Sequence, residues 1–182
     1  RDRNWQSPEL PFYFVQLSSL NRPSWPWFRD SQRQLMQQIP HTGMAVSSDK
    51  GDSLDVHPRD KRPIGERLAR WALHKEYGFS NLLPSGPLFK SAQVEGKQVV
   101  VDFLYGKGLQ PSNGKEIIGF DIAETDGLYY PAKATIQGER IILHSPQVKT
   151  PHFIRYGWQP FTRANLMNAE GLPASTFREE IF

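Results

Sequence analysis

One loop of the sequence holds most of the side chains that could do chemistry. Residues 48–58 contain Asp49, Asp52, Asp55 and His57. A histidine with a carboxylate partner can make a serine hydroxyl nucleophilic: the carboxylate fixes the tautomer, and the other ring nitrogen takes the hydroxyl proton. Imidazole, with a reference pKa of about 6.5, suits this work near neutral pH. His57 is therefore a candidate general base, and each of the three aspartates is a possible partner.

Two other interpretations of the loop stay open at this point. A histidine in an acidic surface loop is often only a solvated side chain. An Asp-rich loop with a glycine could also bind a cation, but the spacing does not match the EF-hand template. We therefore do not expect a metal site in this loop.

The segments around the loop predict a parallel α/β arrangement. Residues 11–17 form a nearly continuous apolar run, typical of a strand buried on both faces, and residues 42–47 resemble a second buried strand. A helix is expected over residues 28–39, with Phe28, Leu35, Met36 and Ile39 on its buried face. A last helix covers about residues 60–77, with Asp60 as N-cap and Gly78 as its stop. The loop then lies outside the carboxyl end of a strand, where open α/β sheets bind ligands.

The sequence changes character near residue 80. Short alternating strands are expected at residues 97–104, 117–121 and 139–143, separated by turn signals such as Glu95-Gly96 and Gln137-Gly138. We predict two parts: residues 1–78 as the C-terminal portion of a doubly wound α/β domain, and residues 79–182 as an antiparallel β-sandwich or jelly-roll-like domain.

Composition excludes several function classes. The net charge is only +3, and acidic residues are interspersed with the basic ones, so nothing indicates a nucleic-acid-binding surface. The chain has no cysteine, which removes thiolate nucleophiles and Cys-based zinc sites. No stretch approaches the roughly 20 apolar residues of a membrane span. The chain begins at Arg1 without Met, and we expect a fragment of a longer protein.

Several motifs together resemble the sialate O-acetylesterase family, within the SGNH/GDSL-type carbohydrate esterases. They occur in the family's order along most of the chain, and the histidine block and the closing segment are the most specific. The matching pieces are Arg29-Asp30-Ser31-Gln32, Gly43-Met44-Ala45-Val46, Asp55-Val56-His57-Pro58-Arg59-Asp60-Lys61, Arg155-Tyr156-Gly157-Trp158, and Gly171-Leu172-Pro173-Ala174-Ser175 with Phe177-Arg178.

The resemblance implies a Ser–His mechanism with an acidic helper and without metal or diffusible cofactor. His57 matches the family's catalytic histidine. Relatives in the wider superfamily carry Asp three residues before the histidine, where this chain has Leu54. Asp55 and Asp52 are therefore the candidate partners, with Asp49 behind them. In an extended loop Asp55 and His57 would point the same way, which permits a contact.

The family's serine block, a Gly-x-Ser motif after the domain's first strand, is absent, as are the blocks that complete the oxyanion hole. We therefore expect activity only with an N-terminal segment or companion chain that brings the serine and the oxyanion hole. Gly51-Asp52-Ser53-Leu54 spells the superfamily's signature, but it lies late in the domain and directly beside the histidine. We interpret that match as accidental.

The expected reaction is removal of acetyl groups from O-acetylated sialic acid. The alternatives are another glycan acetylesterase, such as one acting on acetylxylan, and a non-catalytic carbohydrate-binding β-sandwich. Trp5, Tyr156 and Trp158 could stack on sugars, although core or interface positions are the more common use of such rings. Arg29 and Arg33 could neutralise a sialic-acid carboxylate. The substrate class alone indicates a periplasmic or secreted protein.

Overall fold

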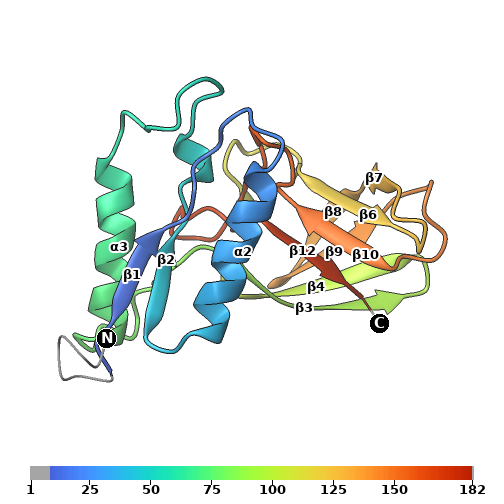
Figure 1. Ribbon diagram of the computed structural model, residues 1–182. Helices are drawn as coiled ribbons and strands as arrows, with labels where there is room; N and C mark the ends of the chain where they lie inside the picture. The colour runs from blue at the N-terminus through green and yellow to red at the C-terminus, as the bar shows by residue number, and fades with distance from the viewer. Residues whose placement is uncertain (1–8, 182) are drawn as a thin grey trace.

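The computed structural model describes residues 9–181, and its first part is a small parallel sheet between two helices (Figure 1). Strand β1 is followed by helix α2, strand β2, the 3-10 helix η1 and helix α3. The parallel pairing sets Phe12 opposite Thr42 and Val15 opposite Ala45, and α2 supplies the crossover that parallel strands need. These elements comprise β1 (Phe12–Val15), α2 (Trp25–Gln38), β2 (Thr42–Ala45), η1 (Ser48–Lys50) and α3 (Arg62–Lys75).

Strand β1 lies at the predicted place, but the prediction that it is buried on both faces is wrong. Phe12 is 57% exposed and Val15 is 38% exposed. The reason is the sheet itself: β1 has β2 on one side and, among residues 9–181, no strand on the other. The Gln32 side chain covers part of this open edge, where its Oε1 accepts a hydrogen bond from the Leu17 N–H at 2.8 Å.

Helix α2 buries mostly other residues than those that the sequence predicted. Met36 is buried as expected, but Phe28, Leu35 and Ile39 are 55%, 50% and 45% exposed. The buried positions are mostly charged, namely Pro26, Arg29, Asp30, Arg33 and Met36. Burial of charged side chains requires partners. Arg33 and Asp30 pair with each other within the helix, and both arginines also have partners in distant parts of the chain. The apolar stripe is left facing outward.

Helix α3 starts two residues later than predicted. Its N-cap is Lys61 and not Asp60, whose carboxylate instead pairs with Lys50 Nζ at 3.1 Å. Trp71 anchors the helix on β2, because its indole N–H donates to the Met44 carbonyl at 2.9 Å. A Cβ atom at Gly43 would lie 2.5 Å from that indole ring, so only glycine permits this approach. Gly78 follows the helix with a φ of +76°, as expected of a stop.

From Leu88 to the end of the described chain the regular elements are all strands, joined by turns and loops. They build two four-stranded antiparallel sheets, in the orders β12-β10-β6-β7 and β3-β4-β9-β8, and a small β11-β5 pair. The strands are β3 (Leu88–Glu95), β4 (Gln98–Leu104), β5 (Gln110–Pro111), β6 (Phe120–Ala123), β7 (Tyr129–Pro131), β8 (Lys133–Gln137), β9 (Arg140–His144), β10 (Phe153–Tyr156), β11 (Leu166–Met167) and β12 (Phe177–Glu180).

The two large sheets share one core, as in a β-sandwich. Val101 and Leu143 of one sheet belong to the same buried cluster as Ile122 and Phe177 of the other. The strands predicted at residues 97–104 and 139–143 are confirmed as β4 and β9. The one predicted at residues 117–121 begins only at Phe120, because Gly119 has a φ of +103° that ends extended backbone before it.

Candidate functional site

The predicted histidine loop lies where the parallel sheet meets the start of α3. The loop follows β2, passes through η1 and leads into α3, so it lies at the carboxyl end of the parallel sheet (Figure 1). A cavity of about 340 Å³ opens on this loop. It is lined by Asp49, Lys50, Gly51, Asp52, Asp55, His57, Pro58, Arg59 and Asp60.

Asp55 and His57 are in contact. The Asp55 Oδ1 atom accepts the His57 backbone N–H at 2.9 Å and lies 3.1 Å from His57 Nδ1. The hydrogen bond from the His57 backbone, and then the one from its ring, lower the pKa of the Asp55 carboxyl. A carboxylate at Nδ1 holds the proton there and leaves Nε2 as the proton acceptor. The ring is 81% exposed in this chain, so Nε2 is open to a partner.

Asp52 makes a different contact. Its Oδ1 accepts the Leu54 backbone N–H at 2.8 Å, which closes a turn one step earlier in the loop. Among the described residues, neither Asp52 nor the Ser53 hydroxyl is hydrogen-bonded to the His57 ring. The structure therefore brings Asp55, and not Asp52, to the histidine.

Asp49 is engaged by α3. Its two carboxylate oxygens accept hydrogen bonds from Arg67, Oδ1 from Nη1 at 2.6 Å and Oδ2 from Nη2 at 2.7 Å. The Arg67 Nη1 atom also donates to the Val46 carbonyl at 2.7 Å. Sequence reasoning missed Arg67, although its place one helical turn from Ile64 and Trp71 puts it on the buried side of α3.

The segment after β1 holds the other side of the loop. Ser18 Oγ donates to the Val56 carbonyl at 2.9 Å and Ser19 Oγ to the Ser48 carbonyl at 2.8 Å. The close approach requires glycine at position 51, since a Cβ there would lie 2.2 Å from the Ser19 carbonyl oxygen. These serines were not singled out from the sequence; hydroxyls directly after a buried strand were the available signal.

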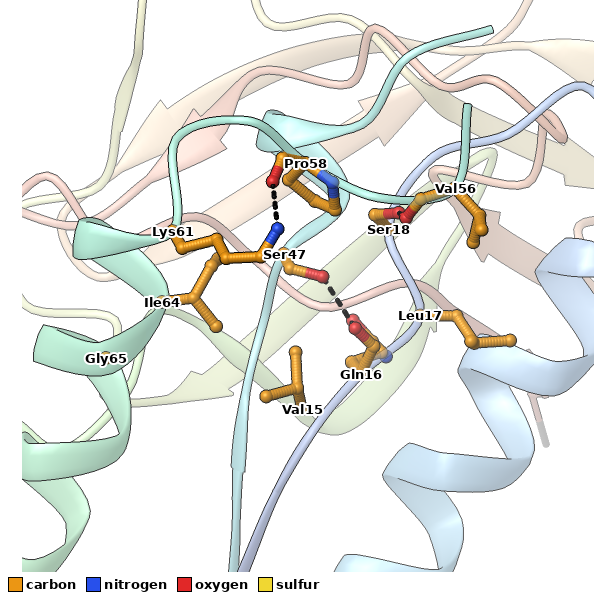
Figure 2. A pocket seen from close by; sticks show the side chains of 10 residues that line it. All are labelled: Val15, Gln16, Leu17, Ser18, Ser47, Val56, Pro58, Lys61, Ile64 and Gly65. Atoms are coloured by element: carbon orange, nitrogen blue, oxygen red, sulfur yellow. Dashed lines mark hydrogen bonds between the residues drawn. The ribbon is translucent and has the colours of Figure 1, made fainter. Parts of the chain in front are cut away.

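An apolar groove borders the loop on the open side of β1. It has a volume of about 320 Å³, and Figure 2 shows Ser18 and Val56 on one of its walls and Lys61 and Ile64 on the other. Ser47 Oγ donates to the Gln16 carbonyl at 2.6 Å, and Lys61 Nζ to the Pro58 carbonyl at 3.1 Å. Two backbone carbonyls beside the groove thus accept side-chain hydrogen bonds, and the groove lies next to Val56, the residue that precedes His57.

Arg29 and Arg33 do not face a ligand, so the expectation that they neutralise a substrate carboxylate is wrong. Arg29 is fully buried, and its guanidinium donates to three carbonyls of the 157–160 turn and to the Thr176 hydroxyl. Burial lowers the pKa of Arg29 to about 10, which still leaves it charged at neutral pH. Arg33 is equally buried and pairs with Asp30 and Glu179. Both arginines join α2 to the β-rich part.

The aromatic residues considered for sugar stacking have separate outcomes. Tyr156 is buried in the core, and its hydroxyl accepts the Leu166 N–H at 2.8 Å, so it cannot stack on a ligand. Trp158 is half-buried, with its ring centroid 5.1 Å from that of Trp27 of α2. Trp5 lies outside the described residues.

Neither helix in the described part is long and apolar enough to span a bilayer. Within residues 9–181, no three His, Asp or Glu side chains gather closely enough to hold a metal ion. The absence of a metal and of a cofactor stays a prediction.

Comparisons with known proteins find similar carbohydrate esterases. No family model matches the chain. The chain is 29% identical to a rat (Rattus norvegicus) sialate O-acetylesterase, over 82% of this chain and 31% of that protein. It is 32% identical to a mouse (Mus musculus) sialate O-acetylesterase, over 56% of this chain and 21% of that protein. The chain thus spans less than a third of the length of these curated relatives.

A solved structure is similar over nearly the whole chain. The crystal structure of a carbohydrate acetylesterase from Xanthomonas citri matches with a TM-score of 0.90 and 39% identity, over 98% of this chain and 43% of that one. The mixed helix and sheet fold is therefore that of a carbohydrate acetylesterase over the shared region. In sequence and in fold this chain is related to the sialate O-acetylesterase and carbohydrate esterase family, which confirms the resemblance that its motifs indicated.

Proposed function

We propose that the chain supplies the histidine of a serine-dependent carbohydrate O-acetylesterase. The observation that carries the proposal is the Asp55–His57 pair at the carboxyl end of the parallel sheet, with Nδ1 on the carboxylate and the ring otherwise open. In the proposal His57 is the general base and Asp55 its orienting carboxylate, while Asp52 shapes the loop. The division into a catalytic portion, residues 1–78, and a β-rich domain, residues 79–182, is part of the same proposal.

The chemistry needs a serine from protein outside this sequence. That serine attacks the acetyl carbonyl while His57 Nε2 accepts its proton. The resulting imidazolium, stabilised by Asp55, protonates the sugar oxygen as the C–O bond breaks, which leaves an acetyl-serine. His57 then takes a proton from water, the hydroxide attacks the ester, and the proton returns to the serine as acetate leaves.

The exposed apolar surface supports a companion segment or chain. Among residues 9–181 it has three parts: the side of β1 that has no neighbouring strand, the outward stripe of α2, and the groove of about 320 Å³ beside the histidine loop. Proteins usually cover large exposed apolar surfaces and strand edges that have no neighbouring strand. A parallel strand added to β1 would end beside the loop, and a serine following it would approach His57.

The leading substrate is O-acetylated sialic acid, after the names of the rat and mouse relatives. Another acetylated glycan is the second candidate, because the solved relative, at 39% identity, is described only as a carbohydrate acetylesterase. A periplasmic or secreted location follows from this substrate class and stays a prediction.

The test assembles the chain with the polypeptide encoded directly upstream and measures cleavage of p-nitrophenyl acetate and of O-acetylated sialic acid. His57→Ala should lower kcat by about a thousandfold or more, because the loss of one member of a catalytic set removes most of the activity of the whole set. His144→Ala, an exposed histidine at the end of β9, is the matched control and should leave kcat unchanged. A His57→Ala loss below about tenfold would contradict the proposal.

A further inference from the structure

The β-rich part carries a second cleft that the esterase chemistry does not use. It has a volume of about 500 Å³ and lies where β6 meets the β7–β8 segment, within the size range of small-molecule sites. Its lining residues come from three segments, residues 116–121, residues 131–134 and Gln159. The histidine cavity shares none of them.

A buried carboxylate is held in the wall of this cleft. Asp121 is 7% exposed, and its Oδ2 pairs with Arg155 Nε at 2.8 Å. The Arg155 guanidinium in turn stacks on the Tyr129 ring, 4.0 Å from its centroid. The pairing occupies one Asp121 oxygen and fixes its orientation, and no other hydrogen bond of the carboxylate is found among the described residues. Asp121 is thus a lining residue whose carboxylate is held in one orientation and keeps a second oxygen for a further donor.

The rest of the lining offers exposed groups of mixed character. Gln159 and Lys133 are exposed and can donate, and Glu116 can accept. Ile118 and Pro131 add exposed apolar surface. With Arg155 behind Asp121, the positive and negative charges balance. This combination fits a ligand that is uncharged, rich in hydroxyls and apolar on its ring faces.

We propose that this cleft binds a neutral glycan chain, with Asp121 and Gln159 on its hydroxyls. That the ligand is a glycan rests on the proposed function, whereas the cleft and its charge balance do not. The site would hold a polysaccharide on the β-rich part while the histidine loop acts on an acetyl group elsewhere.

The test is a binding titration of the full chain labelled with ¹⁵N, followed by its amide signals. Xylohexaose and cellohexaose are the neutral probes, and N-acetylneuraminic acid is the acidic one. A neutral probe should shift the amide signals of Gly119, Asp121 and Lys133 saturably, with Kd below about 10 mM, while the acid should not. No saturable shift at these amides with either neutral probe, or tighter binding of the acid there, would overturn the proposal.

Substitutions at exposed positions locate the site without unfolding the chain. Gln159→Ala and Lys133→Ala should each raise the Kd at least about fivefold, the loss expected for one hydrogen bond. Gln137→Ala and Lys97→Ala, exposed and outside the cleft, should leave it unchanged. An unchanged Kd in the first pair refutes the cleft. His57→Ala should bind like the unmodified chain, so a failed esterase test and a failed binding test remain distinguishable.

Discussion

The Asp49 carboxylate and the Arg67 guanidinium are joined by two parallel hydrogen bonds, of 2.6 and 2.7 Å. The same Arg67 donates to the Val46 carbonyl at 2.7 Å. One side chain of α3 therefore fixes both the end of β2 and the start of the histidine loop. The serines after β1 fix the other side of the loop, so His57 extends from a supported turn although its ring is exposed.

Arg67→Ala should destabilise the chain by about 2 to 4 kcal/mol, because it leaves the Asp49 carboxylate and the Val46 carbonyl without their donor. Urea unfolding followed by circular dichroism measures the change. Arg62→Ala is the matched control: Arg62 lies on the same helix, in an exposed pair with Glu66, and should leave the urea midpoint unchanged. Equal midpoints for both variants would argue against Arg67 as the support of the loop.

The two candidate aspartates should differ in the assembled enzyme. Asp55→Asn removes the charge beside Nδ1 and should lower kcat by about 10² to 10⁴, as a wrong tautomer becomes available. Asp52→Asn should change kcat by less than about threefold, since an asparagine oxygen also accepts the Leu54 N–H. Steady-state kinetics on an acetylated sugar decide between them. Similar losses in both variants would remove the distinction between orienting and turn-forming roles.

The ionisation of Asp55 gives a pH dependence with a definite sign. Hydrogen bonds from the His57 backbone and ring lower its pKa, so folding favours the charged form. The resulting stabilisation is present above the ordinary carboxyl pKa of about 3.9 and is lost as the pH falls through the lowered value. A carbon-detected NMR titration should therefore find the pKa of the Asp55 carboxyl below the ordinary value of about 3.9. In His57→Ala the pKa of Asp55 should rise only in part, because the backbone N–H of residue 57 still donates to the carboxylate. In the unmodified chain, a pKa of Asp55 at or above the ordinary value would contradict the contact.

The sequence predicted the elements better than their faces. Strands β4 and β9 follow from alternation and turn residues, since both signals are local. The buried face of α2 does not, because Arg29 and Arg33 are buried by contacts with Gly157 and Glu179, about 130 to 145 positions away. No periodicity within the helix reports such partners. An apolar stripe on a helix indicates that the helix packs against another apolar surface. Among residues 9–181, no segment buries Phe28, Leu35 or Ile39.

The candidate site shows the same limit. The spacing of Asp55 and His57 indicated a contact through an extended loop, whereas the contact arises from a turn in which the carboxylate also caps the His57 N–H. Asp49, Asp52 and Asp55 look alike in sequence. Only the placement of Arg67 and of the Leu54 amide separates their roles.

The outward stripe of α2 predicts where a companion binds. Leu35→Glu should raise the Kd for the upstream polypeptide at least about tenfold, because it places a charge in an apolar contact. Leu35 is half exposed in this chain, so the urea midpoint of the chain alone should not change. Leu128→Glu, the same replacement at an exposed turn between β6 and β7, is the control for binding. Unchanged affinity in Leu35→Glu would place the companion elsewhere.

Gly51 tests how tightly the histidine loop is packed on the segment after β1. Its φ of −73° suits any residue, but a Cβ would lie 2.2 Å from the Ser19 carbonyl oxygen and 2.4 Å from its nitrogen. Both are backbone atoms, so relief requires moving one segment off the other. Gly51→Ala should therefore cost about 2 to 3 kcal/mol in urea unfolding. Gly65→Ala, in open space within α3, should instead stabilise by about 0.5 to 1 kcal/mol through helix propensity. If Gly51→Ala also stabilised the chain, the loop would not rest on Ser19, and its support would have to come from Arg67 and from the Ser18 hydrogen bond to the Val56 carbonyl.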